Sequence, residues 1–529
     1  MGDGTGVEQT DVGDRRERSE PAVTPRKKRV ERLLDTIERV GNQVPHPAVI
    51  FLVLIGIVVV LSHLFAVLGA SVTYETINAE THQVEEVTTA ARSLLTSEGI
   101  AFMFSGVVGN FMSFTAVGVI IVAMLGVGVA EASGLIDALI RKLVRVAPRR
   151  ALTYILVFIG IVSSIAADAG YLVLIPLAAA AFLSMGRHPL AGLAASFAGV
   201  AAVFSVNILI KPLDGILTEI TNDAIHLLDP ARSLDLTANF LFSIASVVLL
   251  TVVVGLITDR VVEPRLGEYR GARPEAQGKD LSPDESRGLR YTLWALVGVV
   301  AVLALLSVPR GAPLRNPETG ALLGDSPLMS GLIVAITILF LAMGLAYGIG
   351  ARTIKGIPDV TSAMEKAVSS LGPLLFLLFI ISQFLALFTY SNMATLAAVK
   401  MGDALESAGL GALPLLIGFI LVVIVLDLIM TGAIPKWAIF APVFIPLLMR
   451  LGVDPAAVLA AYRVGDSPMN AISPLNAYFA LIVTFSQKYQ PSAGVGTLVA
   501  LMLPYVLVVP VFWIVLFAAW QLLGIPWGF

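Results

Sequence analysis

Two apolar stretches of this sequence are interrupted in the same way, and a second interruption follows each. Small, polar and charged residues break the first stretch at 163–170 and the second at 431–437, after which each run resumes through proline. A further polar break containing asparagine and proline follows, at 207–214 in the first case and at 470–476 in the second. Paired interruptions at corresponding places in two halves of a chain are typical of discontinuous helices that meet at the middle of a bilayer.

The composition of the chain indicates a membrane setting. Hydrophobic residues make up 57% of it and charged residues 14%, against about 25% charged residues in an average soluble domain. The runs 48–68, 238–257 and 498–522 each reach the roughly 20 apolar residues that a spanning helix needs. The absence of cysteine excludes disulfides, iron–sulfur clusters and thiolate metal sites. We therefore expect an all-α polytopic membrane protein in contact with a lipid bilayer, with no cofactor and no nucleic-acid partner.

Lysine and arginine predict the orientation of the chain. They concentrate at 26–32, at 141–150 and in the charged loop 259–290, and such segments face the cytoplasm. We expect the N-terminus on the same side, on a mostly disordered tail of residues 1–46, in a bacterial-type inner membrane. Stretches poor in lysine and arginine are expected to face the opposite side; they are 71–98, 308–328 and 402–409.

These constraints fit nine membrane crossings, with the C-terminus on the outer side. Three of the crossings are expected to be broken within the membrane, because polar residues or proline interrupt them. The predicted crossings are 47–70, 114–136, 189–227 (broken), 237–258, 291–308, 329–349, 368–400 (broken), 456–485 (broken) and 497–523.

Two further apolar segments are predicted to be re-entrant hairpins. Residues 151–186 begin and end next to cytoplasmic arginines, so the segment must turn back within the membrane. Residues 411–449 lie between two outer segments, so they form a hairpin that enters from the opposite face. The halves 47–258 and 291–529 are then inverted repeats joined by the loop 259–290. Broken backbone at this depth is tolerated only where it lines a protein-buried or wet cavity.

Four short motifs stand out: GVGVAEASG at 126–134, VEPRLG at 262–267, KWAIFAP at 436–442 and YRVGDS at 462–467. Together they resemble the AbgT family of aminobenzoyl-glutamate transporters, and the match covers nearly everything from about residue 35 to the end. The resemblance implies a homodimer of the ion-transporter superfamily, each protomer with nine spans and two opposed hairpins. It also implies transport of p-aminobenzoyl-glutamate or related aromatic carboxylates on a Na⁺ or H⁺ gradient, with sulfonamide export in some members and no enzymatic activity.

The sequence departs from the family pattern at the second hairpin. The pattern has a small hydroxyl residue three positions before the tryptophan, an alanine before the lysine and an asparagine ten positions before the tryptophan. Here those positions hold Ile434, Pro435 and Asp427. These changes preserve the expected fold and bear on the substrate and on the ion stoichiometry.

Two aspartates are the first candidates for ion coupling. Asp168 lies among small residues at the first hairpin tip, where a carboxylate is costly unless it is paired, hydrated or bound to a cation. The alternative for Asp168 is a capping role at the tip. Asp466 follows Arg463 by three residues, so a structural ion pair on one helical face is the alternative for Asp466.

Two asparagines in the later breaks are the next candidates for ion coupling. The amide oxygens of Asn207 and Asn470, with carbonyl groups freed by the break, suit Na⁺, a hard cation that prefers oxygen. Capping of the broken helix ends is the alternative for both. The predicted Na⁺ ligands are Ser163, Ser164, Asn207 and Asn470, and the complete ion-coupling set is Asp168, Asn207, Asp466, Asn470 and Asp427.

The second hairpin supplies the aromatic part of the predicted substrate site. Trp437 either stacks on an aromatic substrate while Lys436 meets its carboxylate, or anchors the chain at the bilayer interface. Asp427 either pairs with Lys436 or carries a proton by itself. The resemblance places Asn392 near the site, and stabilisation of a kink is its alternative role. The predicted substrate contacts are Trp437, Lys436, Asn392, Asp168, Asp466, Arg463 and Pro474.

We interpret the chain as a secondary active transporter, for which there are three alternatives. A dicarboxylate carrier of the same superfamily shares the fold, but its paired Ser-Asn-Thr hairpin motifs do not occur here. An intramembrane aspartyl protease needs two aspartates, for which Asp168 and Asp466 are available, but its Gly-x-Gly-Asp and Tyr-Asp motifs are missing. A passive channel does not require an inverted pair of hairpins.

Overall fold

The computed structural model of the chain is built mostly of helices. Eight helices in the described part are long and apolar enough to cross a membrane, as the composition predicts. Shorter apolar helical segments accompany them, among them Leu152–Ser163 and Ala412–Asp427. The structure describes residues 2, 47–77, 84–148, 151–165, 170–271, 281–322, 326–407, 411–428, 430, 432–473, 475–476 and 478–529.

In the first half of the chain, π-helical turns lie beside the interruptions of the helices. The turn η1 (Gly170–Leu174) precedes α8, η2 (Ala198–Ala202) follows α9, and η3 (Thr258–Val262) joins α11 to α12. Such turns occur frequently at functional sites. The helices are α2 (Pro47–Val67), α3 (Ser97–Ser105), α4 (Val107–Met112), α5 (Thr115–Ala132), α6 (Leu135–Val146), α7 (Leu152–Ser163), α8 (Ile175–Ser184), α9 (Pro189–Phe197), α10 (Pro212–Ile225), α11 (Phe240–Ile257) and α12 (Glu263–Leu266).

Several helices of the second half begin at a proline, a residue whose fixed φ suits the first helical position. In α13, Ser282 caps the helix and accepts from the Glu285 N–H, while the Glu285 side chain accepts from the Ser282 N–H. The elements are α13 (Pro283–Ser307), α14 (Pro327–Ser330), α15 (Leu332–Ala351), α16 (Ile357–Ser370), α17 (Gly372–Tyr390), α18 (Met393–Ser407), α19 (Ala412–Asp427), α20 (Ala433–Arg450), α21 (Pro455–Asp466), the 3₁₀ turn η4 (Pro468–Ala471), α22 (Phe479–Gln487) and α23 (Val495–Leu522).

The predicted crossings and hairpins all fall on helices. Each broken crossing contains a helix, an interruption and a second helix, and each of the segments 151–186 and 411–449 contains two helices separated by a short break. The number of crossings, the face from which each hairpin enters, the division into halves and the side of the N-terminus stay predictions. The tail 1–46 lies outside the described residues apart from Gly2.

Two expectations need correction. The all-α prediction missed an antiparallel pair of strands, β1 (Ser71–Ile77) and β2 (Val84–Ala90), in which Ser71 lies opposite Ala90. Valine, threonine and isoleucine make up four of the seven residues in each strand, and β-branched residues favour this conformation. The segment 259–290 is also only partly a loop, because η3 and α12 extend α11 to Leu266 and α13 begins at Pro283.

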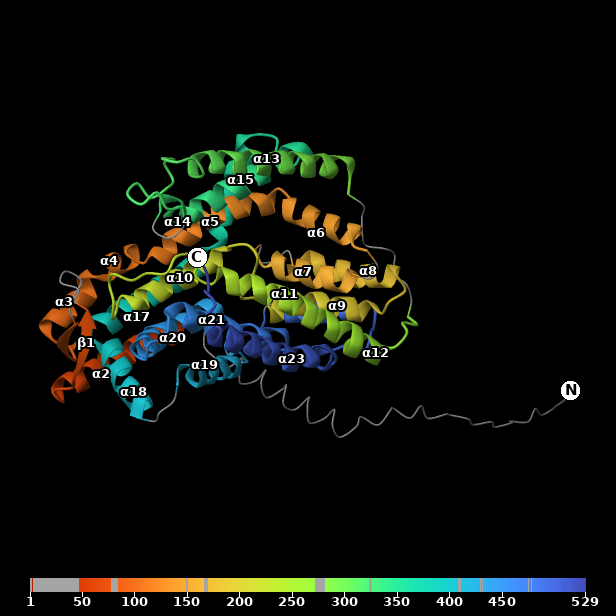
Figure 1. Cartoon of the computed structure of the whole chain (residues 1–529). Helices are drawn as coiled ribbons and strands as arrows, with labels where there is room; N and C mark the ends of the chain where they lie inside the picture. The colour runs from red at the N-terminus through yellow and green to blue at the C-terminus, as the bar shows by residue number, and fades with distance from the viewer. Residues whose placement is uncertain are drawn as a thin grey trace.

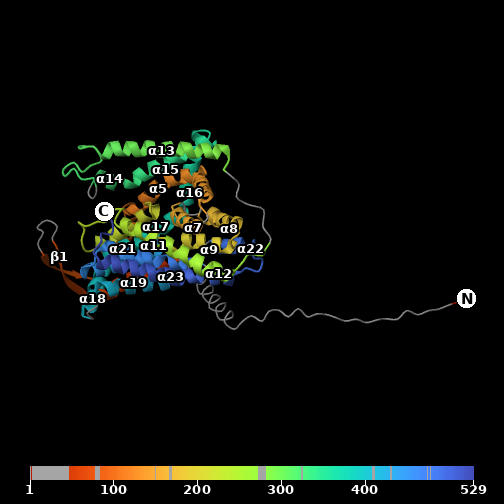
Figure 2. The same cartoon turned by 45° about the vertical axis from the view of Figure 1, so that its right-hand side comes forward.

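Helices α5, α13 and α15 pack together as one group along an edge of the molecule (Figures 1 and 2). Small residues allow the close approach of α5 to α15. A Cβ atom on Gly126 would lie 2.3 Å from the carbonyl oxygen of Thr337, and one on Gly344 would lie 2.7 Å from the backbone of Ala130. The glycine-rich motif 126–134 therefore has a packing role, as small residues do between membrane helices.

The remaining helices bring the interruptions of the two halves together. Helix α10 packs against α20 and α21, and η2 packs against η4. Figure 1 shows α10, α20 and α21 in the same part of the molecule, with β1 and α18 at the left end and α8 and α12 at the right. The segment before α10 and the segment after α21 thus meet inside the protein.

Candidate functional site

The unwound segment between η2 and α10, called the first-half break below, touches the end of α21 through two serines. The Ser205 N–H donates to Ser467 Oγ over 2.9 Å, and Ser205 Oγ donates to Asp466 Oδ2 over 2.8 Å. All three residues are fully buried. The contact is possible because the chain between η2 and α10 is unwound, which leaves its backbone groups available to the opposite half.

Every buried charged residue in the described part of the chain lies at this junction. Three are acidic and three are basic, so their formal charges balance. A charge inside a bilayer protein is costly unless a partner or water compensates it, and the concentration of all of them in one place marks the site. The six residues are Lys211, Asp214, Asp427, Lys436, Arg463 and Asp466.

Lys436 is shared by two carboxylates. Its Nζ contacts Asp427 Oδ1 at the end of α19 and lies 2.8 Å from Asp466 Oδ1 at the end of α21. The predicted contact between Asp427 and Lys436 is therefore present. Among the described residues, Asp427 Oδ2 has no hydrogen-bond partner. The second hairpin thus holds one ammonium between two acids, one of which keeps an uncompensated oxygen.

Arg463 does not pair with Asp466, contrary to the alternative drawn from their spacing. Its Nη1 lies 2.6 Å from Asp214 Oδ1 and donates to the Ser205 carbonyl over 2.8 Å, while its Nε donates to Asn239 Oδ1 over 3.2 Å. The two neighbours on α21 take different partners because Asp214 and Lys436 approach that helix from separate elements. Both ion pairs therefore join separate elements.

Asp214 is a site residue that sequence reasoning missed. Its Oδ1 binds Arg463 across the two halves, and its Oδ2 accepts from the backbone N–H of Lys211 over 2.8 Å at the start of α10. The second contact is the capping interaction expected of an acid in a first helical turn. The signal was present, because Lys-Pro-Leu-Asp at 211–214 resembles Ser-Pro-Leu-Asn at 473–476 in the other half.

Trp437 lies in the contact between the two halves. Its Nε1 donates to Thr221 Oγ1 over 3.0 Å and to the Leu217 carbonyl over 3.2 Å, both on α10. Its ring lies 4.5 Å from that of Tyr462, with 31° between the planes. The side chain is 0% exposed, which rules out an anchor at the bilayer interface. In this conformation the ring faces protein, so stacking on a substrate stays a prediction.

The predicted Na⁺ ligands of the first half are engaged with each other and with backbone. Asn207 Nδ2 donates to Ser164 Oγ over 3.0 Å, and Asn207 Oδ1 accepts from the Leu209 N–H over 3.0 Å. Ser163 Oγ donates to the Gly160 carbonyl over 2.7 Å. These contacts match the capping alternative for Asn207, and they leave few oxygen atoms directed at a shared point.

The remaining predicted residues have local partners or lie outside the described part. Asn470 Nδ2 donates to the Asp466 carbonyl over 3.1 Å. Asn392 has a positive φ of 60° and donates to the Ala90 carbonyl of β2 over 2.8 Å, as a kink-stabilising residue would. Asp168 and Pro474 lie outside the described residues, so their predicted roles stay predictions.

The motif at 262–267 anchors the far end of α11. Glu263 binds Arg187, which also lies 2.7 Å from Asp259 and donates to Thr153 Oγ1 over 2.8 Å. The neighbouring His188 lies in the turn before α9. Burial lowers the pKa of His188, and the nearby Glu263 carboxylate acts in the opposite direction. This cluster fixes the turn between α8 and α9, and α9 leads into the break at 207–214.

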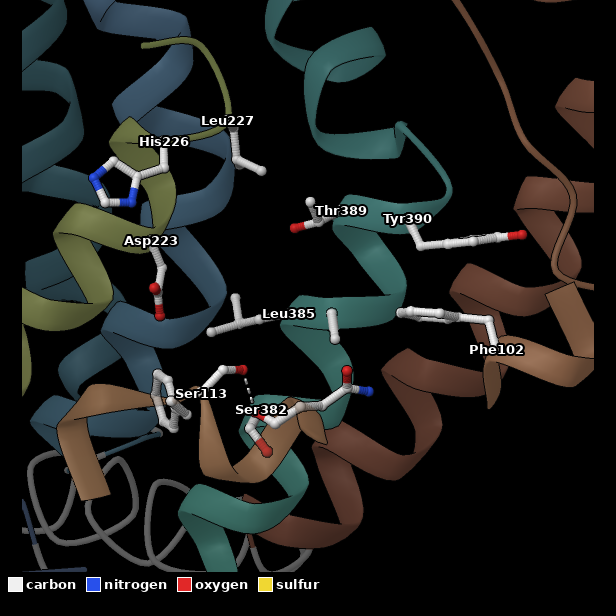
Figure 3. A pocket seen from close by; sticks show the side chains of 12 residues that line it. Phe102, Ser113, Asp223, His226, Leu227, Ser382, Leu385, Thr389 and Tyr390 are labelled. Carbon is white, nitrogen blue, oxygen red and sulfur yellow. Dashed lines mark hydrogen bonds between the residues drawn. The ribbon is translucent and has the colours of Figure 1, made fainter. Parts of the chain in front are cut away.

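A cavity of about 440 Å³ lies between α10, α17 and the helices α3 and α4. Figure 3 shows Asp223 of α10 directed into it opposite Leu385 of α17. Asp223 forms no ion pair with another described residue, and none of the predicted site residues lines the cavity. The lining residues are Phe102, Asn110, Ser113, Phe114, Asp223, His226, Leu227, Ser382, Leu385, Ala386, Thr389 and Tyr390.

Comparison with known proteins gives a consistent result. The model of the AbgT putative transporter family matches residues 32–529. The chain is 34% identical over 497 residues to the p-aminobenzoyl-glutamate transport protein of Escherichia coli strain K12, covering 94% of this chain and 96% of that protein.

Two solved structures are similar over most of the chain. The YdaH transporter of Alcanivorax borkumensis has a TM-score of 0.86 and 40% identity, with 92% of this chain and 100% of that chain covered. MtrF of Neisseria gonorrhoeae, described within a class of antimetabolite efflux pumps, has a TM-score of 0.87 and 38% identity, with coverages of 92% and 97%.

Proposed function

The chain belongs to the AbgT transporter family, and we propose that it carries p-aminobenzoyl-glutamate or a related aromatic carboxylate on a Na⁺ or H⁺ gradient. Membership confirms the resemblance drawn from the four motifs. Transporter relatives favour a carrier over an intramembrane protease. From the resemblance and the distribution of lysine and arginine, we also propose a homodimer in an inner membrane, with a cytoplasmic N-terminus.

One observation carries the proposal: the buried charged residues of the described part gather where the two halves meet. A structural ion pair needs two partners, whereas this junction holds three acids and three bases. Lys436 and Arg463 are the natural partners for a substrate carboxylate, and each is held by an internal carboxylate in this conformation. A dianionic substrate would compete with those carboxylates for the two bases.

That competition supplies a reason for ion coupling. When a substrate carboxylate takes Lys436 from Asp466, the aspartate is left without its partner in a site that excludes water. A carboxylate in such a place needs a new cation. Substrate binding and cation binding therefore favour each other, which is the linkage that a symporter requires.

The buried position of Trp437 indicates that the site must open before the substrate enters. Its ring lies against Tyr462 of α21 and its N–H binds α10, so an incoming aromatic ring needs α20 to separate from one of these helices. Movement of a hairpin against the rest of the protein is the kind of rearrangement that alternating access uses.

Flux of labelled p-aminobenzoyl-glutamate into proteoliposomes tests the proposal. Vesicles of one batch are given an inward Na⁺ gradient, an inward H⁺ gradient, both or neither, with membrane potential clamped. We expect the substrate to accumulate above its equilibrium level under at least one ion gradient. Without an ion gradient we expect no accumulation above that level. Uptake that only equilibrates in all four conditions would indicate a passive pathway. The absence of saturable uptake, with a dicarboxylate transported instead, would favour the other carrier class.

A further inference from the structure

A lysine occupies the first-half break. Lys211 directly precedes α10 and is 1% exposed. Its Nζ donates to the Phe204 carbonyl, lies 3.4 Å from Ser164 Oγ, and lies 4.6 Å from the centre of the Phe204 ring. A carbonyl, a hydroxyl and a ring face are groups that attract a cation. No salt bridge joins this ammonium to a carboxylate in the described part of the chain.

The same region does not fit Na⁺. The ammonium of Lys211 and the amide NH₂ of Asn207 both approach Ser164 Oγ as donors. The amide oxygen of Asn207 is turned away to the Leu209 N–H, which fixes the orientation of the amide. A Na⁺ ion beside Ser164 would therefore meet an ammonium and an N–H₂ group, whereas it requires oxygen atoms.

In the other half of the chain, a serine occupies the position that corresponds to Lys211. Aligning Lys-Pro-Leu-Asp at 211–214 with Ser-Pro-Leu-Asn at 473–476 places Ser473 opposite Lys211. Ser473 Oγ donates to the Leu428 carbonyl over 3.5 Å. Leu428 is the residue after the last residue of α19, and Ser164 is the residue after the last residue of α7. In the predicted inverted repeats the two contacts occupy equivalent positions, one ending on a side-chain hydroxyl and the other on a backbone carbonyl, and only the first uses an ammonium.

We infer that the Lys211 ammonium is a tethered substitute for Na⁺ in the first half of the carrier, so that the described residues around Ser164 bind no free Na⁺. The inference rests on the proposed function in one respect, because it concerns where a carrier driven by a Na⁺ or H⁺ gradient binds its cation. The side chain of Lys211 supplies a permanent positive charge at this place. A carrier without the lysine would have to bind a cation from solution there. Any Na⁺ dependence of this carrier then arises elsewhere than at Ser163, Ser164 and Asn207.

Replacing the lysine by the residue of the other half tests the inference. The purified full-length protein in detergent is heated in NaCl and in KCl at equal ionic strength, without substrate, and the difference in Tm is the measured Na⁺-specific shift. In Lys211→Ser the ammonium is removed and a hydroxyl is added. We expect a saturable Na⁺-specific shift of about 3 °C or more beyond that of the wild type, since a ligand that binds only the folded state raises Tm.

The matched control is Lys211→Met, which removes the charge and offers no oxygen, so its shift should equal that of the wild type. If Lys211→Ser cannot be purified, Lys211→Gln is measured in the same way. Equal shifts in the wild type and in the serine or glutamine variant overturn the inference, as does failure of both variants to fold in NaCl. Because the assay contains no substrate, its result is independent of whether p-aminobenzoyl-glutamate is transported.

Discussion

The ammonium of Lys436 and the carboxylate of Asp466 form a buried ion pair, with 2.8 Å between Nζ and Oδ1, that joins α20 of the second hairpin to the end of α21. Both side chains are 1% exposed, so the pair is shielded from salt and water. A hairpin that moves away from α21 must break this contact. The pair therefore makes the position of the hairpin sensitive to any ligand that replaces one of its members.

We expect Asp466→Asn to fold and to lose gradient-driven accumulation. The amide keeps the shape of the side chain. Ser205 Oγ and Tyr462 OH donate to different oxygens of the Asp466 carboxylate, so the single amide oxygen can keep one of these two hydrogen bonds. It cannot bind a cation as a carboxylate does. The measurement is concentrative uptake in proteoliposomes, normalised to the amount of inserted protein.

The control for this change is Asp403→Asn, because the Asp403 side chain is 56% exposed and lies 3.5 Å from Arg450 at the surface. That variant should accumulate substrate like the wild type. Wild-type accumulation by Asp466→Asn would reduce Asp466 to a structural role.

Because Lys436 is shared by two carboxylates, we expect its replacement to destabilise the protein more than the replacement of Asp427. Lys436→Met leaves Asp427 and Asp466 facing each other without a cation, so its destabilisation should be near the roughly 3–5 kcal/mol seen when one partner of a buried pair is removed. Asp427→Asn leaves Lys436 with Asp466, so its effect should be smaller. The double variant should be more stable than Lys436→Met alone. Thermal unfolding in detergent measures all four proteins, and simple additivity would mean that Asp427 acts independently of Lys436.

Close packing of α5 on α15 gives a prediction about stability alone. A Cβ on Gly126 would lie 2.3 Å from the Thr337 carbonyl oxygen, a contact that real side chains do not make. Gly126→Ala should therefore lower Tm, with about 1–3 kcal/mol lost to overpacking. Gly298→Ala on α13 is the matched control, because its Cβ would meet nothing within 4 Å. Equal Tm values for the two variants would show that α5 and α15 can move apart without lowering the free energy of unfolding.

The sequence was sufficient for the helices and the interruptions because both depend on local composition. Runs of apolar residues predict spanning helices, and proline and asparagine mark where a helix must stop. The antiparallel strands β1 and β2 were missed because they lie in a segment, 71–98, interpreted only by its lack of lysine and arginine. The high content of β-branched residues in both strands was the available signal.

The partners within the site could not be predicted from spacing. Arg463 and Asp466 are neighbours on α21, yet Arg463 binds Asp214 and Asp466 binds Lys436, since both partners come from other elements that only the tertiary fold places nearby. Asp427 and Lys436 were predictable as a pair because they flank one short turn. Lys211 went unnoticed because its neighbour Ser164 is distant in sequence.

The last prediction separates the aromatic face of Trp437 from its N–H group. If the ring stacks on the substrate, Trp437→Leu should weaken the affinity for p-aminobenzoyl-glutamate about tenfold or more, since stacking on an aromatic side chain contributes roughly 1–3 kcal/mol per ring in nucleic-acid complexes. Trp437→Phe keeps a ring and should have a milder effect. Thr221→Val removes one of the two acceptors of the indole N–H without changing the ring, so it should leave the affinity near that of the wild type. Binding is measured by competition with labelled substrate. Equal affinity in the wild type and Trp437→Leu would leave Trp437 as a contact between the two halves and nothing more.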